Sequence, residues 1–220
     1  MKVKYFFRAF ILMLITVIML IASIIFRNLI IDALGLNDSV AAILGPILYG
    51  LVYLIIFYKI KINFSEMFRK NIKIKYVILL FILAFLYIIF ESLMLILMSN
   101  LPKFDLYNIT NVIKFKGFTQ ISNIIYTFLI TIIIAPFCEE VLYRGVILDN
   151  MIKLQINKPI AIFLSAIIFS ISHMNLAQGI NALVYGIFAG ILYCKGNDIK
   201  YNILFHSSIN FITFLMISLR

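Results

Sequence analysis

Long apolar runs, separated by short polar segments, fill most of the chain. Seven of these runs are interpreted as membrane-spanning helices. Their approximate limits are Tyr5–Phe26, Val40–Tyr58, Tyr76–Met98, Ile121–Leu148, Ile160–His173, Ala177–Cys194 and Tyr201–Leu219. Several are shorter or longer than the ~20 residues that a straight span needs, so we expect tilts or helical extensions beyond the bilayer. The amphipathic piece Asn28–Asn37 is expected to lie at the membrane interface or to form a re-entrant turn, which would raise the count to eight. The pattern predicts an all-α, polytopic transmembrane bundle of about seven helices.

The composition points to the same class of protein. Of the 220 residues, 64% are hydrophobic and 13% are charged, whereas soluble domains average roughly 45–50% and 25%. The mean hydropathy is +1.11. A soluble domain of this length could not hide so much apolar surface from water, so we interpret the chain as one integral membrane domain.

The net charge of +10 would suit a nucleic-acid-binding protein, but the basic residues lie between apolar runs and form no motif-supported face. We interpret them as determinants of topology and as contacts for the anionic headgroups of the lipid bilayer. They gather before the first run and in the second loop, at Lys2, Lys4, Arg8, Lys59, Lys61, Arg69, Lys70, Lys73 and Lys75. The positive-inside rule then predicts a multi-pass cell-membrane protein with a cytoplasmic N-terminus and no nucleic-acid partner.

Ionisable and polar groups inside apolar spans mark candidate functional residues, because inserting such a charge costs about 2.5–3.5 kcal/mol. This chain concentrates them in its second half, in three predicted spans, and both of its histidines belong to the set. The residues are Glu139, Glu140, Arg144, His173, His206 and Asn210.

Helical spacing arranges several of these residues in pairs. Glu140 and Arg144 are four residues apart, so they can pair on one face, and a purely structural ion pair is one reading of them. Glu139 lies about 100° around the helix from Glu140 and is left without that partner. His206 and Asn210 are also four apart and point into the same space.

A hairpin of the fourth and fifth predicted spans brings a carboxylate and an imidazole to similar depth. The polar turn Gln155–Pro159 joins the spans; Glu139 lies 18 residues before Asn157 and His173 lies 16 after it. At about 1.5 Å per residue the two differ in depth by only about 3 Å, so they could share a water, and His206 enters from the same side. The alternative is that the histidines serve only as interhelical hydrogen-bonding groups.

Two further residues bear on this region. Pro136 lacks a backbone donor and is expected to kink the helix just before the glutamates. Glu91, isolated in the third span, is open to a cavity-lining, lipid-interface or catalytic interpretation.

The ordered motifs Glu-Glu-x-x-x-Arg, Phe-x-x-x-His and His-x-x-x-Asn resemble those of the CPBP family of intramembrane proteases, also called CAAX-protease-like or Abi proteins. They span roughly Ile121–Phe214, whereas the first 120 residues are similar only in being hydrophobic and multi-spanning. The resemblance implies a catalytic core in residues 121–220, preceded by N-terminal helices of the same bundle in residues 1–120.

The resemblance also implies an all-helical membrane endopeptidase with specific roles for the polar residues. Glu139 and His173 would activate the attacking water, and His206 and Asn210 would stabilise the oxyanion. The substrate would be a membrane-associated peptide or protein, prenylated or bacteriocin-like.

The resemblance gives Glu140 and Arg144 the role of supporting the motif helix.

The resemblance leaves open whether the enzyme uses a cofactor. The expected mechanism uses no cofactor, but Glu139, His173 and His206 could instead hold zinc with one open position. The chain lacks a His-Glu-x-x-His signature, and this favours the metal-free route.

Two other functions remain as alternatives. A catalytically inactive scaffold or immunity protein could keep the same architecture. A transporter could use Glu91, Glu139 and the histidines as a proton relay, but the chain shows no repeat of two halves.

Overall fold

The structure is a computed structural model that describes residues 35, 38–59, 61–68, 71–99, 124–125, 127–173, 176–196 and 198–218. Throughout these residues all regular structure is helical. The elements are α2 (Asp38–Lys59), α3 (Phe64–Met67), α4 (Ile74–Ser99), the π-helical η2 (Phe128–Ile134), α7 (Ala135–Glu140), the π-helical η3 (Val141–Leu148), α8 (Asp149–Lys153), α9 (Lys158–Ile171), α10 (Leu176–Gly196) and α11 (Ile199–Ser218).

The long helices agree with the predicted spans to within a few residues wherever the structure describes them. Two of them, at Ile74–Met94 in α4 and Gln178–Gly196 in α10, are long and apolar enough to cross a membrane. The predicted span Tyr5–Phe26 lies outside the described residues, as does Asn28–Asn37 apart from Gly35. The all-helical class is confirmed for the described part, and the count of seven spans stays a prediction.

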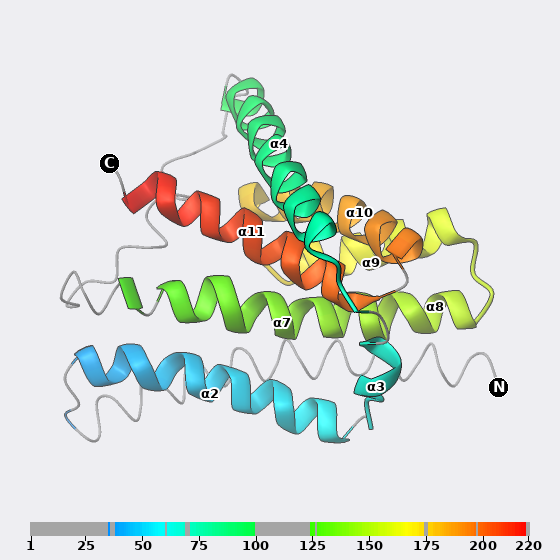
Figure 1. Ribbon diagram of the computed structural model, residues 1–220, viewed down its shortest axis with the longest axis horizontal. Helices are drawn as coiled ribbons and strands as arrows, with labels where there is room; N and C mark the ends of the chain where they lie inside the picture. Colours follow the sequence, from blue (N-terminus) through cyan, green and yellow to red (C-terminus); the bar gives the residue numbers. More distant parts are fainter. Residues whose placement is uncertain are drawn as a thin grey trace.

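One unbroken helical run from Phe128 to Lys153 forms the centre of the bundle, through η2, α7, η3 and α8. In Figure 1 this run lies between α2 on one side and α11 on the other, and α4 leans steeply across α11. Every residue from Val141 to Leu148 is buried, because neighbouring helices cover this part of the run on all sides. The run therefore places its polar residues inside protein.

Pro136 lies inside this helical run. The Ala135 N–H donates to the Ile130 carbonyl, which is the i to i−5 spacing of a π-helix. The next bond of that series would join the carbonyl of Thr131 to an N–H at position 136, which proline lacks. The backbone stays helical at the position where the sequence predicts a kink. The Thr131 carbonyl is left without this backbone donor and needs another hydrogen-bond partner.

Small residues bring α9 and α10 into close contact. A Cβ atom built on Gly186 would lie 2.8 Å from the Cβ of Ala166, and one on Gly190 would lie 2.8 Å from Ile162 Cγ2. Small residues at such positions let helix backbones approach closely, as membrane helix pairs commonly do. The contact fixes the rotation of α10, and with it the direction of the side chain next to Gly186.

The last helix, α11, begins at a capping aspartate. Asp198 accepts a hydrogen bond from the Lys200 N–H at 2.9 Å, as an N-terminal cap does. Asn202, completely buried, donates from Nδ2 to the Ala189 carbonyl of α10 at 2.6 Å. These two bonds fix the start of the helix that carries the second histidine.

Candidate active site

Glu140 lies at the centre of a buried polar cluster. Its side chain is 0% exposed, and its Oε2 lies 3.2 Å from Nε of Arg144, which is 1% exposed. The spacing of four residues predicts this pair, and the structure confirms it. A buried charge pair of this kind is costly to break on one side, because the remaining charge has no water around it.

The carboxylate of Glu140 also holds a histidine from a different helix. Nδ1 of His206 in α11 lies 3.0 Å from Glu140 Oε1, and the same oxygen accepts a 2.8 Å hydrogen bond from the Tyr185 hydroxyl in α10. From depth along the helices, His206 is expected near Glu139 and His173, but its direct partner is Glu140. The helix rotation decides this, because it turns Glu140, and not Glu139, toward α10 and α11.

The bond to Glu140 limits what His206 can do. A carboxylate accepts, so Nδ1 of His206 carries the hydrogen. A neutral ring would then present only a lone pair at Nε2, which cannot stabilise an oxyanion. Any oxyanion role for His206 therefore requires the imidazolium form, for which the Glu140 carboxylate is a suitable counter-ion.

His173 lies in the turn that follows α9, and it is partly buried. Its Nδ1 lies 2.9 Å from the carbonyl oxygen of Phe169, one helical turn earlier. Because a carbonyl can only accept, Nδ1 carries the hydrogen and Nε2 is left as the basic nitrogen of the neutral ring. That tautomer suits a group that takes a proton from water.

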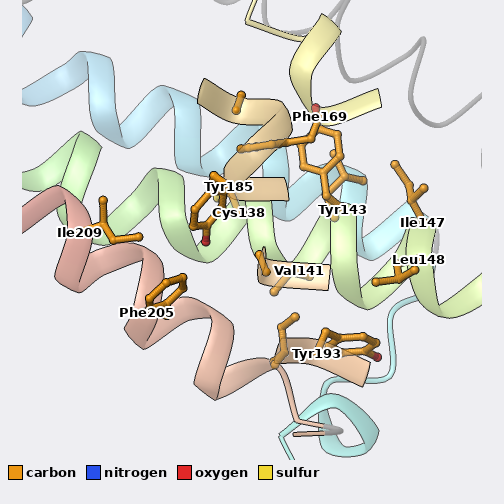
Figure 2. Close-up of a cluster of buried hydrophobic side chains, with 14 of the residues drawn as sticks. Cys138, Val141, Tyr143, Ile147, Leu148, Phe169, Tyr185, Tyr193, Phe205 and Ile209 are labelled. Carbon is orange, nitrogen blue, oxygen red and sulfur yellow. The ribbon is translucent and has the colours of Figure 1, made fainter. Parts of the chain in front are cut away.

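Phe169, the aromatic residue of the second motif, touches most of the cluster. Its ring centroid lies 4.8 Å from that of His173, 6.5 Å from that of His206 and 4.9 Å from that of Tyr143. The Arg144 guanidinium carbon lies 4.6 Å from the same ring centroid. Figure 2 shows Phe169 against Tyr143 of the central run. The Phe169 ring thus packs near both histidines, His173 and His206.

The outer nitrogens of Arg144, Nη1 and Nη2, have no hydrogen-bond partner among the described residues. Instead the guanidinium lies over two aromatic rings, those of Phe169 at 4.6 Å and Tyr185 at 5.2 Å. Cation–π contacts of this type are worth about 2 kcal/mol or more when water is excluded. They explain how the charge is tolerated with only one carboxylate partner.

Glu139 is partly buried on a different side of the same helix. It lies near the hydroxyls of Tyr49 and Tyr53 in α2 and near that of Tyr143 in η3. Ser172, the neighbour of His173, donates its hydroxyl to the Phe169 carbonyl at 2.6 Å. Glu139 is the glutamate that is not part of the ion pair with Arg144.

Asn210 does not share a partner with His206. Its Nδ2 donates to the carbonyl oxygen of Thr131 at 2.6 Å, and this is the carbonyl that Pro136 leaves without a backbone donor. One N–H of the Asn210 amide is used in this bond, and the other is left for a second acceptor. His206 and Asn210 thus contact different groups of the central run, and their shared action on an oxyanion stays a prediction.

Glu91 lies on α4 and is partly buried. It follows by one helical turn Tyr87, whose ring centroid lies 6.0 Å from that of Tyr185.

The alternative zinc site can be judged from the same geometry. In the part of the chain that the structure describes, no three His, Cys, Asp or Glu side chains gather in a way that could hold a metal ion. His173 and His206 each donate one ring N–H to a protein acceptor, the Phe169 carbonyl and Glu140 respectively, which leaves Nε2 of each ring available. Glu139, His173 and His206 do not form such a group among the described residues, and the choice between the metal-free and the zinc mechanism stays a prediction.

Tyr185, Thr131 and Tyr143 contact the predicted residues but were not expected from the sequence motifs. Of these, Tyr185 and Tyr143 had a usable signal in the sequence. Each places a hydroxyl inside an apolar helix, and a buried tyrosine hydroxyl usually finds a polar partner.

Residues 121–212 match the family model described as type II CAAX prenyl endopeptidase Rce1-like. Neither the search of curated proteins nor the search of solved structures found a match to the chain. The matched segment holds all three motifs and every residue of the cluster around Glu140. The match confirms the resemblance to the CAAX-protease-like family over this segment.

Proposed function

We propose that this protein is an intramembrane endopeptidase of the CAAX-protease type, cutting a peptide bond of a membrane-associated substrate. The family match over residues 121–212 supports the reaction class. The observation that carries the proposal is the pair of histidines with defined tautomers around one buried glutamate–arginine pair. A merely structural cluster has no need for a second glutamate beside it that forms no ion pair with the described residues.

In the proposed mechanism, Glu139 and Nε2 of His173 hold the attacking water. One of them takes its proton as the hydroxide oxygen bonds to the scissile carbonyl carbon. The carbonyl oxygen becomes an oxyanion, stabilised by the Nε2–H of protonated His206 and by the remaining N–H of Asn210. The proton then passes to the departing amine nitrogen as the C–N bond breaks.

The charges of this arrangement support the mechanism. Ionised Glu139 and Glu140 carry two negative charges, and Arg144 with protonated His206 carries two positive ones. The four sum to zero, so the protonated histidine needed for the oxyanion does not leave the buried site with a net charge. Donors aimed at a developing oxyanion contribute about 2.7–4 kcal/mol each.

The substrate is proposed to reach the site from the bilayer. The chain is expected to be multi-pass, with its N-terminus and the 59–75 loop in the cytoplasm, and the apolar exterior of α4 supports contact with lipid. A prenylated peptide tail, whose lipid partitions into the membrane, is the first substrate to test, and a bacteriocin-like peptide is the second.

The test is a proteolysis assay on membranes that contain the protein, with peptide tails in prenylated and unprenylated forms. We expect cleavage of at least one membrane-anchored peptide and none with the Glu139→Gln variant. Metal content is measured on the same active preparation, with a chelator and zinc add-back. We expect less than one zinc per chain and full activity in the chelator. No cleavage of any membrane-bound peptide would favour the inactive scaffold instead.

A further inference from the structure

Tyr185 shares one oxygen atom with a proposed catalytic histidine. Its hydroxyl donates to Glu140 Oε1 at 2.8 Å, and His206 Nδ1 lies 3.0 Å from the same atom. Arg144 holds the other oxygen, Oε2, at 3.2 Å. Two hydrogen-bond contacts at one oxygen and one ion pair at the other, from three helical segments, therefore surround this carboxylate.

The ring of Tyr185 also contacts the ring of the histidine directly. The two centroids are 4.7 Å apart with the planes at 45°. The Tyr185 ring also stacks on Phe205, with 6.1 Å between the ring centroids and 15° between the planes. The Arg144 guanidinium carbon lies 5.2 Å from the centroid of the Tyr185 ring. With 6% of its surface exposed, the side chain has little freedom to move. Figure 2 shows Tyr185 and Phe205 reaching the central run from α10 and α11.

We propose that Tyr185 is a positioning residue of this site, which orients His206 through the shared carboxylate oxygen and through ring contact. The inference rests on the proposed function for its catalytic consequence. The hydroxyl limits rotation of the Glu140 carboxylate, and the carboxylate in turn fixes Nδ1 of His206. The direction of Nε2, on the far side of the imidazole ring, then follows from Nδ1.

The same helix offers a matched control. Tyr193, eight residues after Tyr185 in α10, is 8% exposed and donates from its hydroxyl to Asp149 Oδ1 at 3.2 Å. Both tyrosines thus donate to a carboxylate of the central run, but only Tyr185 reaches the oxygen shared with His206. Tyr193→Phe removes a similar hydrogen bond without touching the site.

The activity experiment compares Tyr185→Phe with Tyr193→Phe on a peptide that wild type cleaves. We expect Tyr185→Phe to lower kcat about five- to tenfold with KM within about twofold, because a bond to a charged group is lost while the ring remains. Tyr193→Phe is expected to keep the kcat of wild type, although both variants lose similar thermal stability. Equal kcat values for the two variants would overturn the positioning role.

A spectroscopic experiment tests the inference without any activity. The chain has two histidines, so ¹⁵N-histidine labelling gives two sets of ring signals, assigned with a His173→Gln variant. Tyr185→Phe should move the His206 signals and leave those of His173, and Tyr193→Phe should move neither. If Tyr185→Phe fails to fold, fluorotyrosine at position 185 alters the hydroxyl acidity in an intact protein and should move the same signals. Unmoved His206 signals would overturn the inference. If no peptide is cleaved but the signals move, the proposed function fails and the contact stands.

Discussion

Two helices of this protein show opposite relations between hydropathy and burial. α4 contains the stretch Ile74–Met94, with a mean hydropathy of 2.6, yet most of its large side chains are exposed. The segment from Ala135 to Leu148 carries Glu139, Glu140 and Arg144, yet Val141 to Leu148 and the ion pair are buried. In a soluble protein the more apolar helix would be inside.

The few buried residues of α4 explain the contrast. Leu80, Ala84, Tyr87 and Ile88 recur at helical spacing and form one face toward the bundle. The remaining apolar faces point outward, where lipid is a suitable solvent and water is not. Charges, in turn, are tolerated where other helices supply partners. The comparison teaches that the described part of this fold exposes its most apolar helix and buries its charged groups, which is the arrangement expected of a protein in a bilayer.

The largest expected effect separates Glu139, in the central run, from Glu91, on α4. Glu139→Gln should lower turnover at least about 100-fold while the protein still folds, because glutamine cannot accept the proton of the water. Glu91→Gln, on α4, should stay within about threefold of wild type. Initial rates on membranes, with circular dichroism of the purified variants, provide the measurement. Normal turnover by folded Glu139→Gln would end the general-base assignment, and a large loss with Glu91→Gln would extend the site to α4.

The second effect concerns stability. Arg144→Ala should lower the free energy of unfolding by about 3–5 kcal/mol, because it leaves the buried Glu140 charge without its cation. Lys153→Ala breaks a 2.7 Å ion pair with Asp149, and the Lys153 side chain is 57% exposed. Because water already surrounds this lysine, the substitution should lower the free energy of unfolding by at most about 1 kcal/mol. Denaturant unfolding in detergent measures both. Unchanged stability of Arg144→Ala, with activity lost, would move Arg144 into the catalytic set.

The third effect tests the bond between Asn210 and the carbonyl of Thr131. Asn210→Ala should cost about 1–3 kcal/mol, because that carbonyl loses its donor. The double variant Pro136→Ala with Asn210→Ala should recover about 1 kcal/mol of this loss, since an N–H at position 136 can bond to the carbonyl. A double-mutant cycle of unfolding free energies gives the coupling.

The same cycle separates the two roles of Asn210. If its second N–H also stabilises the oxyanion, the double variant regains stability but not activity. Strictly additive stability losses would show that Pro136 and Asn210 act independently, and would contradict the proline-based explanation of this bond.

The smallest effect is expected on the outward face of α4. Phe85 is 53% exposed, so Phe85→Leu should change the unfolding free energy by no more than about 0.5 kcal/mol. Unfolding in the same detergent measures this. A loss above about 2 kcal/mol would show that this face packs on protein in the folded molecule, and would remove the contrast between α4 and the central run.

Several features of the site follow from the sequence alone, because they depend on local geometry. The spacing of four residues is enough to pair Glu140 with Arg144, since a helix puts such residues on one face whatever surrounds it. The ordered motifs are enough to indicate the family over residues 121–212, and the apolar runs are enough to place α2, α4, α9, α10 and α11. None of these inferences needs the relative rotation of two helices.

The partners across helices were decided only by the tertiary structure. His206 meets Glu140 instead of Glu139, and Asn210 serves the Thr131 carbonyl. Tyr185 reaches the site because Gly186 lets α10 approach α9. Depth along a helix can be counted from the sequence, but the direction of a side chain depends on how each helix is rotated in the packed bundle. That rotation is set by contacts of many small and aromatic side chains together, and no single motif encodes it.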